Sequence, residues 1–91
     1  MNKVYCVSYD LNKLGQRYAA LYEELKKSSL WWHYLDSTWL IATHETATQL
    51  SNRLRQRIDS NDYILVIEVR RNSDGWLQQK AWDWINQNVP V

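Results

Sequence analysis

Asp10 is the first candidate for metal chemistry in this 91-residue sequence. It directly follows an alternating apolar segment, residues 3–9, and precedes a polar loop with Asn12 and Lys13. A carboxylate at a strand end can bind Mg²⁺, because the strand fixes the oxygens and the loop leaves the metal open to water and phosphate. The same side chain could instead cap the following turn. One carboxylate is a poor metal site, so a catalytic role requires a dimer in which two copies of Asp10 share one Mg²⁺.

A second set of residues could bind a nucleotide. The net charge of +1 argues against holding duplex DNA through many phosphate contacts, so any nucleic-acid contact must be local. Six Trp and six Tyr are too many rings for one small domain to bury completely. Polar side chains could hold phosphates while a ring stacks on a base, although packing of the rings in the core is the competing interpretation. The candidate nucleotide-binding residues are Asn12, Lys13, Gln16, Arg17, Ser37 and Trp39.

Other reactive residue types lack the neighbours that their chemistry needs. His33 and His44 have no second His, Cys or Asp at metal-ligand spacing, so we expect a half-buried strand residue and a loop residue. Ser37 has no adjacent base to make it a nucleophile, and turn formation explains it. Two basic groups are interpreted as solvated surface: Arg53, Arg55 and Arg57, and Arg70 with Arg71.

Hydrophobic periodicity predicts the elements that position these residues. Apolar or alternating runs rich in β-branched and aromatic residues predict strands at 3–9, 31–35, 38–43 and 63–69. Apolar residues three and four apart predict helices at 16–27 and 46–59, the second behind a capping-box pattern at Thr46. A third helix is predicted with Ser73 or Asp74 as its N-cap. Trp76 and Trp82 would flank its apolar face, so at least one of them should be exposed.

The second and third strands form a predicted hairpin with a two-residue loop at 36–37. With this regular register, Trp32 faces Ile41 and Tyr34 faces Trp39 across the ladder. Such pairs contribute some tenths of a kcal/mol to about 1 kcal/mol each, so the hairpin should help to stabilise the sheet.

The order of elements predicts an α+β fold, a ferredoxin-like βαββαβ antiparallel sheet with an additional C-terminal helix, as one domain of residues 1–91. Right-handed crossovers place the first two helices on one face. The apolar residues of the other face need cover from a second subunit or the last helix, and we expect a homodimer. Cys6 is the only cysteine, which favours a reducing compartment, and no segment approaches the roughly 20 apolar residues that span a bilayer. We therefore expect a cytoplasmic protein with no membrane partner.

Three stretches carry a resemblance to known families: SYDLNK at 8–13, WWHYLDSTWLI at 31–41 and NDYILVIEV at 61–69. Over nearly its full length the sequence resembles small bacterial and phage proteins labelled SinR-like. Its opening strand, which ends in Tyr9 and Asp10, also resembles that of the CRISPR-associated adaptation nucleases and of virulence-associated protein D. This resemblance implies a ferredoxin-like homodimer with Asp10 as the residue of a metal-dependent nuclease. Those relatives close their dimers with an exchanged C-terminal strand, whereas a Trp-rich helix is predicted here.

The sequence thus predicts a homodimer that binds RNA, DNA or a nucleotide at the subunit boundary. Its enzymatic form is a Mg²⁺-dependent phosphodiesterase or endoribonuclease with Asp10 as the catalytic and metal-binding residue. The alternative is a non-catalytic binding module. This module is either a toxin-like or regulatory partner of another protein, or a phage or host factor that sequesters a small or cyclic nucleotide.

Overall fold

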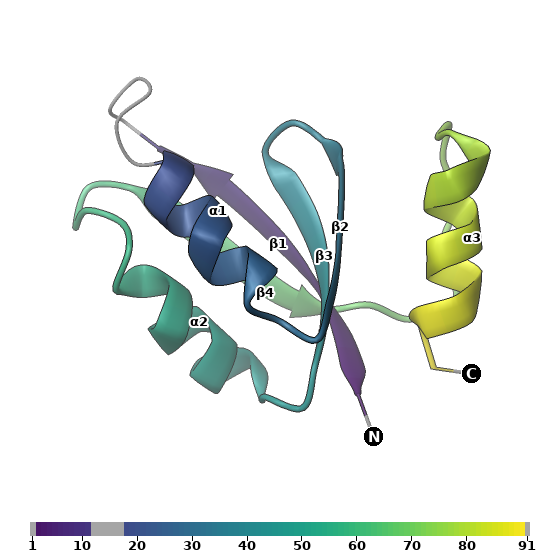
Figure 1. Cartoon of the computed structure of the whole chain (residues 1–91), viewed down its shortest axis with the longest axis horizontal. Helices are drawn as coiled ribbons and strands as arrows, with labels where there is room; N and C mark the ends of the chain where they lie inside the picture. Colours follow the sequence, from purple (N-terminus) through teal and green to yellow (C-terminus); the bar gives the residue numbers. More distant parts are fainter. Residues whose placement is uncertain (1, 12–17, 91) are drawn as a thin grey trace.

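The computed structural model describes residues 2–11 and 18–90, which form four strands and three helices (Figure 1). The strands are β1 (Lys3–Asp10), β2 (Leu30–Leu35), β3 (Thr38–Thr43) and β4 (Tyr63–Glu68). The helices are α1 (Tyr18–Lys26), α2 (Ala47–Arg55) and α3 (Gln79–Asn88). The predicted α+β class is confirmed.

The four strands form one antiparallel sheet in the order β2-β3-β1-β4. The register places Ser8 opposite both Thr38 and Leu65, and Asp10 opposite Tyr63. Residues that lie opposite each other in a ladder point to the same face of the sheet. These five residues therefore share one face, and β2 and β4 are the edge strands.

Helices α1 and α2 cover the other face (Figure 1). Apolar residues from alternate strand positions and from both helices form the core there: Tyr5, Val7, Tyr9, Trp39, Ile41, Leu21, Leu25, Leu50 and Leu54. Full burial of one such Leu side chain contributes about 1.5–3 kcal/mol, so this layer is the main source of stability. Helix α2 begins at the predicted capping box, in which Thr46 and Gln49 each accept the other's backbone N–H, at 3.1 and 2.9 Å.

Helix α3 covers part of the face that carries Asp10 (Figure 1). A second buried cluster joins this helix to three strands, and its members are Val4, Trp32, Leu40, Ala42, Ala81 and Val89. The indole N–H of Trp32 donates to the carbonyl oxygen of Ala81 at 3.3 Å. The helix lies over the end of the sheet that contains Val4. Near Asp10 none of the described helices covers the face, and Tyr63 and Leu65 are exposed there.

A bulge in β2 changes the predicted register of the hairpin. Leu35 lies opposite Thr38, as a two-residue loop requires, but Trp32 lies opposite Leu40 rather than Ile41. Two residues of β2 therefore lie opposite one residue of β3, which is the signature of a bulge. The predicted pairing of Trp32 with Ile41 is wrong for this reason.

The bulge also rearranges the rings around Trp39. Trp31 takes the place opposite Ile41, and its ring centroid lies 5.3 Å from that of Trp39. His33, rather than Tyr34, stacks on Trp39, with centroids 4.0 Å apart and ring planes 13° from parallel. The predicted pair of Tyr34 and Trp39 is replaced by this His–Trp stack.

Helix α3 begins later than predicted. Its N-cap is Gln78, so the assignment of Ser73 or Asp74 as the cap is wrong. The chain first runs without regular structure until Leu77 packs against the second cluster, and only then turns into the helix. Trp76 is fully exposed, as predicted for at least one of the two indoles, but it precedes the helix and does not lie on its flank.

Candidate functional site

The end of β1 that holds Asp10 is the candidate site. Asp10 is the last residue of the strand and is exposed, on the face that α1 and α2 leave open. A depression of about 250 Å³ lies between β1 and β4, and Ser8, Asp10, Tyr63 and Leu65 contribute to its lining. Pockets that enclose a small ligand usually measure about 300–1,000 Å³. The depression is therefore smaller than a pocket that would enclose a small ligand.

Ser37 is brought to the same end of the sheet as Asp10. Its carbonyl oxygen accepts the backbone N–H of Tyr9 at 3.2 Å. The hydroxyl of Tyr9 donates to the carbonyl oxygen of Asp36 at 3.3 Å. These bonds hold the β2–β3 turn against the residue that precedes Asp10, so two of the predicted site residues lie at one end of the sheet. Ser37 is exposed there.

Trp39 lies in the core instead. It is fully buried, and its indole N–H donates to the hydroxyl of Tyr9 at 3.1 Å. His33 stacks on the ring, and Tyr22 approaches it with a centroid distance of 5.2 Å. A base could stack on Trp39 only after these rings separate.

Tyr63 is the aromatic residue at the site that sequence reasoning missed. It lies opposite Asp10 and is 71% exposed, so its ring is accessible beside the carboxylate. Alternation along β4 groups Tyr63 with Leu65 and Ile67, and this grouping is readable from the sequence. Which group faces solvent depends on where α3 lies, and periodicity does not give that position.

Asn12, Lys13, Gln16 and Arg17 lie outside the described residues. Within 2–11 and 18–90, no three His, Cys, Asp or Glu side chains are close enough together to hold a metal ion. In this part of one chain, Asp10 therefore has no companion ligands for Mg²⁺, which prefers octahedral oxygen coordination. A second copy would have to supply another carboxylate.

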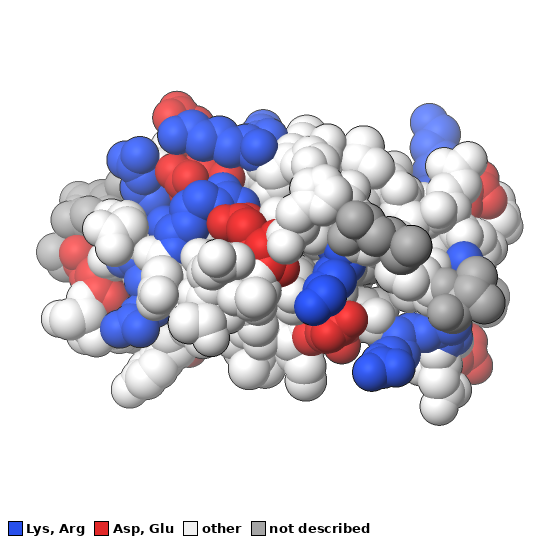
Figure 2. Space-filling view, turned by 90° about the horizontal axis from the view of Figure 1, so that it is seen from below, with Lys and Arg blue, Asp and Glu red and all other residues white. Residues whose placement is uncertain are grey.

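Charged side chains near α1 and α2 alternate in sign. Figure 2 shows Lys and Arg interspersed with Asp and Glu over this end of the molecule, without a broad tract of one sign on the face in view. A uniform basic field is what lets proteins gather nucleic acid through phosphates alone. Ligand recognition on this face would therefore depend on individual contacts.

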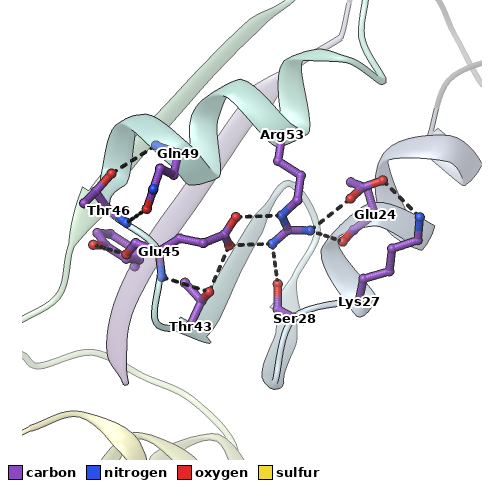
Figure 3. A network of polar contacts seen from close by, with 9 residues as sticks. Glu24, Lys27, Ser28, Thr43, Glu45, Thr46, Gln49 and Arg53 are labelled. Atoms are coloured by element: carbon purple, nitrogen blue, oxygen red, sulfur yellow. Dashed lines mark hydrogen bonds and ion pairs between the residues drawn. The ribbon is translucent and has the colours of Figure 1, made fainter. Parts of the chain in front are cut away.

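Arg53 belongs to a polar network that ties α1 to α2 (Figure 3). Its guanidinium donates to Glu24 at 3.1 Å and to Glu45 at 2.9 Å, and it also reaches the hydroxyl of Ser28 at 2.9 Å. The Arg53 side chain is only 23% exposed, so its interpretation as solvated surface is wrong. The reason is its position on the flank of α2 that faces the buried Glu24.

Hydrogen bonds keep both carboxylates of this network ionised. Burial alone would raise the pKa of Glu24, but hydrogen bonds from Arg53, Lys27 and Arg57 together outweigh burial and lower it. For Glu45, the hydrogen bond from Arg53 is the largest cause of a lowered pKa. Perturbed groups can mark catalytic sites, but here each is paired with a cation. We interpret the network as structural.

No protein-family model matches the chain, and no solved structure matches it significantly. The resemblance to the SinR-labelled proteins and the adaptation nucleases therefore stays a prediction. Among the residues that the structure describes, no helix is long and apolar enough to cross a bilayer.

Proposed function

We propose that the protein binds RNA, DNA or a nucleotide as a cytoplasmic homodimer, at the uncovered end of the sheet. The observation that carries this proposal is the pairing of two exposed residues, Asp10 and Tyr63, on the open face. An aromatic ring can stack on any base, and a carboxylate can hold a cation beside a phosphate. Ser37 adds a hydroxyl at the same end of the sheet.

The dimer in this proposal is supported by the apolar surface of β4. Tyr63, Leu65 and Ile67 are each more than half exposed, at 71%, 58% and 55%, and they follow one another along one face. Contiguous apolar residues in solvent commonly mark an interaction surface. The ferredoxin-like assignment is part of the same proposal, and the order of the elements and of the strands supports it.

The enzymatic form of the proposal is a Mg²⁺-dependent phosphodiesterase or endoribonuclease. When bound, Mg²⁺ neutralises phosphate charge and lowers the pKa of a bound water. Asp10 would hold the ion together with Asp10 of a second copy. This form therefore requires a dimer in which the two carboxylates meet.

Asp10→Asn tests the enzymatic form on labelled RNA and DNA, with and without Mg²⁺. Loss of Mg²⁺-dependent cleavage supports it, and cleavage that persists unchanged in the variant excludes it. Asp36→Asn is the matched control, because it removes one negative charge from the adjacent turn and leaves Asp10 in place.

Tyr63→Ala tests binding to labelled single-stranded RNA. Stacking of a base on an aromatic ring contributes about 1–3 kcal/mol, so we expect at least a severalfold loss of affinity. Tyr34→Ala is the control, since Tyr34 is also exposed but lies on β2. Equal losses in the two variants would contradict a site at Tyr63.

A protein-binding module is the second candidate, and Trp76 favours it. Trp76 is fully exposed and lines a depression of about 380 Å³ together with Tyr34, Leu35 and Leu77. Exposed aromatic residues are enriched at protein interfaces. Thermal unfolding with a panel of nucleotides and cyclic oligonucleotides separates the candidates, because a ligand at 100 times its Kd stabilises the fold by about 2.7 kcal/mol. A Tm unchanged across the panel would favour a protein partner.

A further inference from the structure

The free edge of β4 presents hydrogen-bonding groups to a further strand. Among the described strands, β4 pairs only with β1. The backbone N–H of Val69 donates to the carbonyl oxygen of Val4 at 2.8 Å, just beyond the end of β4. Antiparallel alternation then directs the backbone groups of odd-numbered residues toward β1. The N–H and C=O groups of Ile64, Val66 and Glu68 consequently point to the free edge.

This edge has few of the features that keep strands apart. Soluble proteins protect exposed edges with Lys, Pro, bulges or short strands. β4 has six residues in an unbroken register with β1, and its one charge, Glu68, is at the end. A groove of about 360 Å³ runs beside the edge, between Ile64 and Val66 of β4 and Ser51 and Asn52 of α2. A second strand can therefore approach without displacing a helix.

We propose that two copies of this chain pair through β4, antiparallel, about a twofold axis at Leu65. Because residues opposite each other must point to one face, a symmetric register pairs odd with odd and even with even positions. Leu65 then faces its own copy, Tyr63 faces Ile67, and Ile64 faces Val66. Every pair within this overlap is apolar, so the strand is complementary to itself.

The neighbouring symmetric register is less favourable. An axis at Val66 would place Glu68 opposite Ile64, and this would lay a carboxylate against a half-buried apolar side chain. With the axis at Leu65, Glu68 lies beyond the apolar overlap, at the end of the strand, where it comes opposite Asp62 of the second copy. The axis at Leu65 is favoured because it keeps every pair within residues 63–67 apolar and moves the carboxylates to the ends of the paired strands.

This inference rests on the dimer of the proposed function and specifies its geometry. Asp10 lies opposite Tyr63, so the two Asp10 residues are three strand spacings apart sideways and four residues apart lengthwise, which is about 20 Å. One Mg²⁺ binds oxygens at about 2.1 Å and cannot bridge that gap. The edge dimer therefore excludes the enzymatic form that needs one Mg²⁺ shared by two Asp10 carboxylates, and it supports the binding form. It offers two separate sites on one continuous face, which suits a single strand of nucleic acid that spans both.

Register-specific disulfide cross-linking tests the pairing without any nucleic acid. The background is Cys6→Ser, because Cys6 lies opposite Ile67 within the same chain. Leu65→Cys should oxidise to a covalent dimer, since residues in a non-hydrogen-bonded pair have Cα atoms about 4.5 Å apart, within disulfide range. Tyr63→Cys and Ile67→Cys should cross-link only when the two variants are mixed. Cross-linking of Leu65→Cys with Ile67→Cys instead, or none at all, overturns the proposal.

A second variant tests the interface through the mass in solution. Leu65→Lys should turn the dimer into a monomer by light scattering, because two ammonium groups would face each other on the axis. Leu35→Lys, on the exposed side of β2, is the matched control and should leave the mass unchanged. A dimer that survives Leu65→Lys overturns the edge pairing. A dimer that cross-links as predicted but binds no nucleic acid would refute the proposed function alone.

Discussion

The two edge strands of the sheet differ in how they are protected. β2 contains a bulge, and the chain's own third helix contacts it through the buried Trp32. β4 is regular, has no charge before Glu68, and leaves Leu65 and Ile67 in solvent. The comparison teaches that Trp32 on the first edge is used to pack α3 onto the sheet, whereas Leu65 and Ile67 on the second edge remain accessible to a partner.

The largest expected difference between the edges is in stability. Trp32→Ala should lower the free energy of unfolding by about 3–5 kcal/mol, because it empties a buried site and removes the bond to Ala81. Leu65→Ala, at a position 58% exposed, should cost less than about 1 kcal/mol. Urea unfolding followed by circular dichroism measures both values. Similar losses in the two variants would contradict the contrast.

The next prediction concerns α2, which forms the wall of the groove beside β4. Arg53→Met should lower the free energy of unfolding by about 1–3 kcal/mol, less than for a fully buried pair because Arg53 keeps some exposure. The cost arises because Glu24, only 8% exposed, loses a cationic partner. Arg55→Met, at an exposed position on the same helix, is the control and should stay within about 0.5 kcal/mol of the wild type.

The same network predicts a dependence on pH. Glu24 and Glu45 have pKa values lowered by folding, so the stability they contribute is present above the pKa of an unfolded Glu, about 4.3. It is lost as the pH falls through the lower folded values. Unfolding free energies measured between pH 7 and pH 3 should therefore decline more steeply in the wild type than in Arg53→Met. Parallel curves would show that Arg53 is not the cause.

The smallest predicted effect is at the candidate site beside β4. Asp10→Asn should change the free energy of unfolding by less than about 0.5 kcal/mol, because the side chain is exposed at the end of a strand. Thermal unfolding checks this value in the absence of ligand. A loss above about 1 kcal/mol would instead support the interpretation of Asp10 as a cap for the following turn.

Local patterns in the sequence predict most of the elements, but they do not predict how strands align. The capping box at Thr46 and the strand Thr38–Thr43 agree with the sequence, because each depends on neighbouring residues alone. The bulge between Trp32 and Leu35 could not be predicted, since it depends on packing against both layers. The burial of Arg53 was missed for a similar reason, because Glu24 lies in a different helix.

The residues of the candidate site also differ in whether the sequence alone could predict their position. Asp10 and Ser37 were selected for their chemistry, and the register of the sheet brings both to one end. Trp39 was selected as a ring that could stack on a base, yet its face of β3 is the one that α1 and α2 cover. Tyr63 was not selected, although it is the exposed ring. Residue type suggests what a side chain can bind, whereas its accessibility depends on the layers above it.

The bulge in β2 determines which face of the sheet Trp32 reaches, and thereby whether α3 can pack on that face. If the same residues of β2 paired without the bulge, Trp32 would lie opposite Ile41, and the indole that donates to Ala81 would point away from α3. Inserting one residue between Trp32 and Leu35, with the bulge kept at one additional residue, would place Trp32 opposite Ile41 and should therefore release the C-terminal segment from the sheet. A one-codon insertion here would thus leave two layers, whereas a one-codon deletion that removes the bulge would keep Trp32 opposite Leu40 and preserve all three.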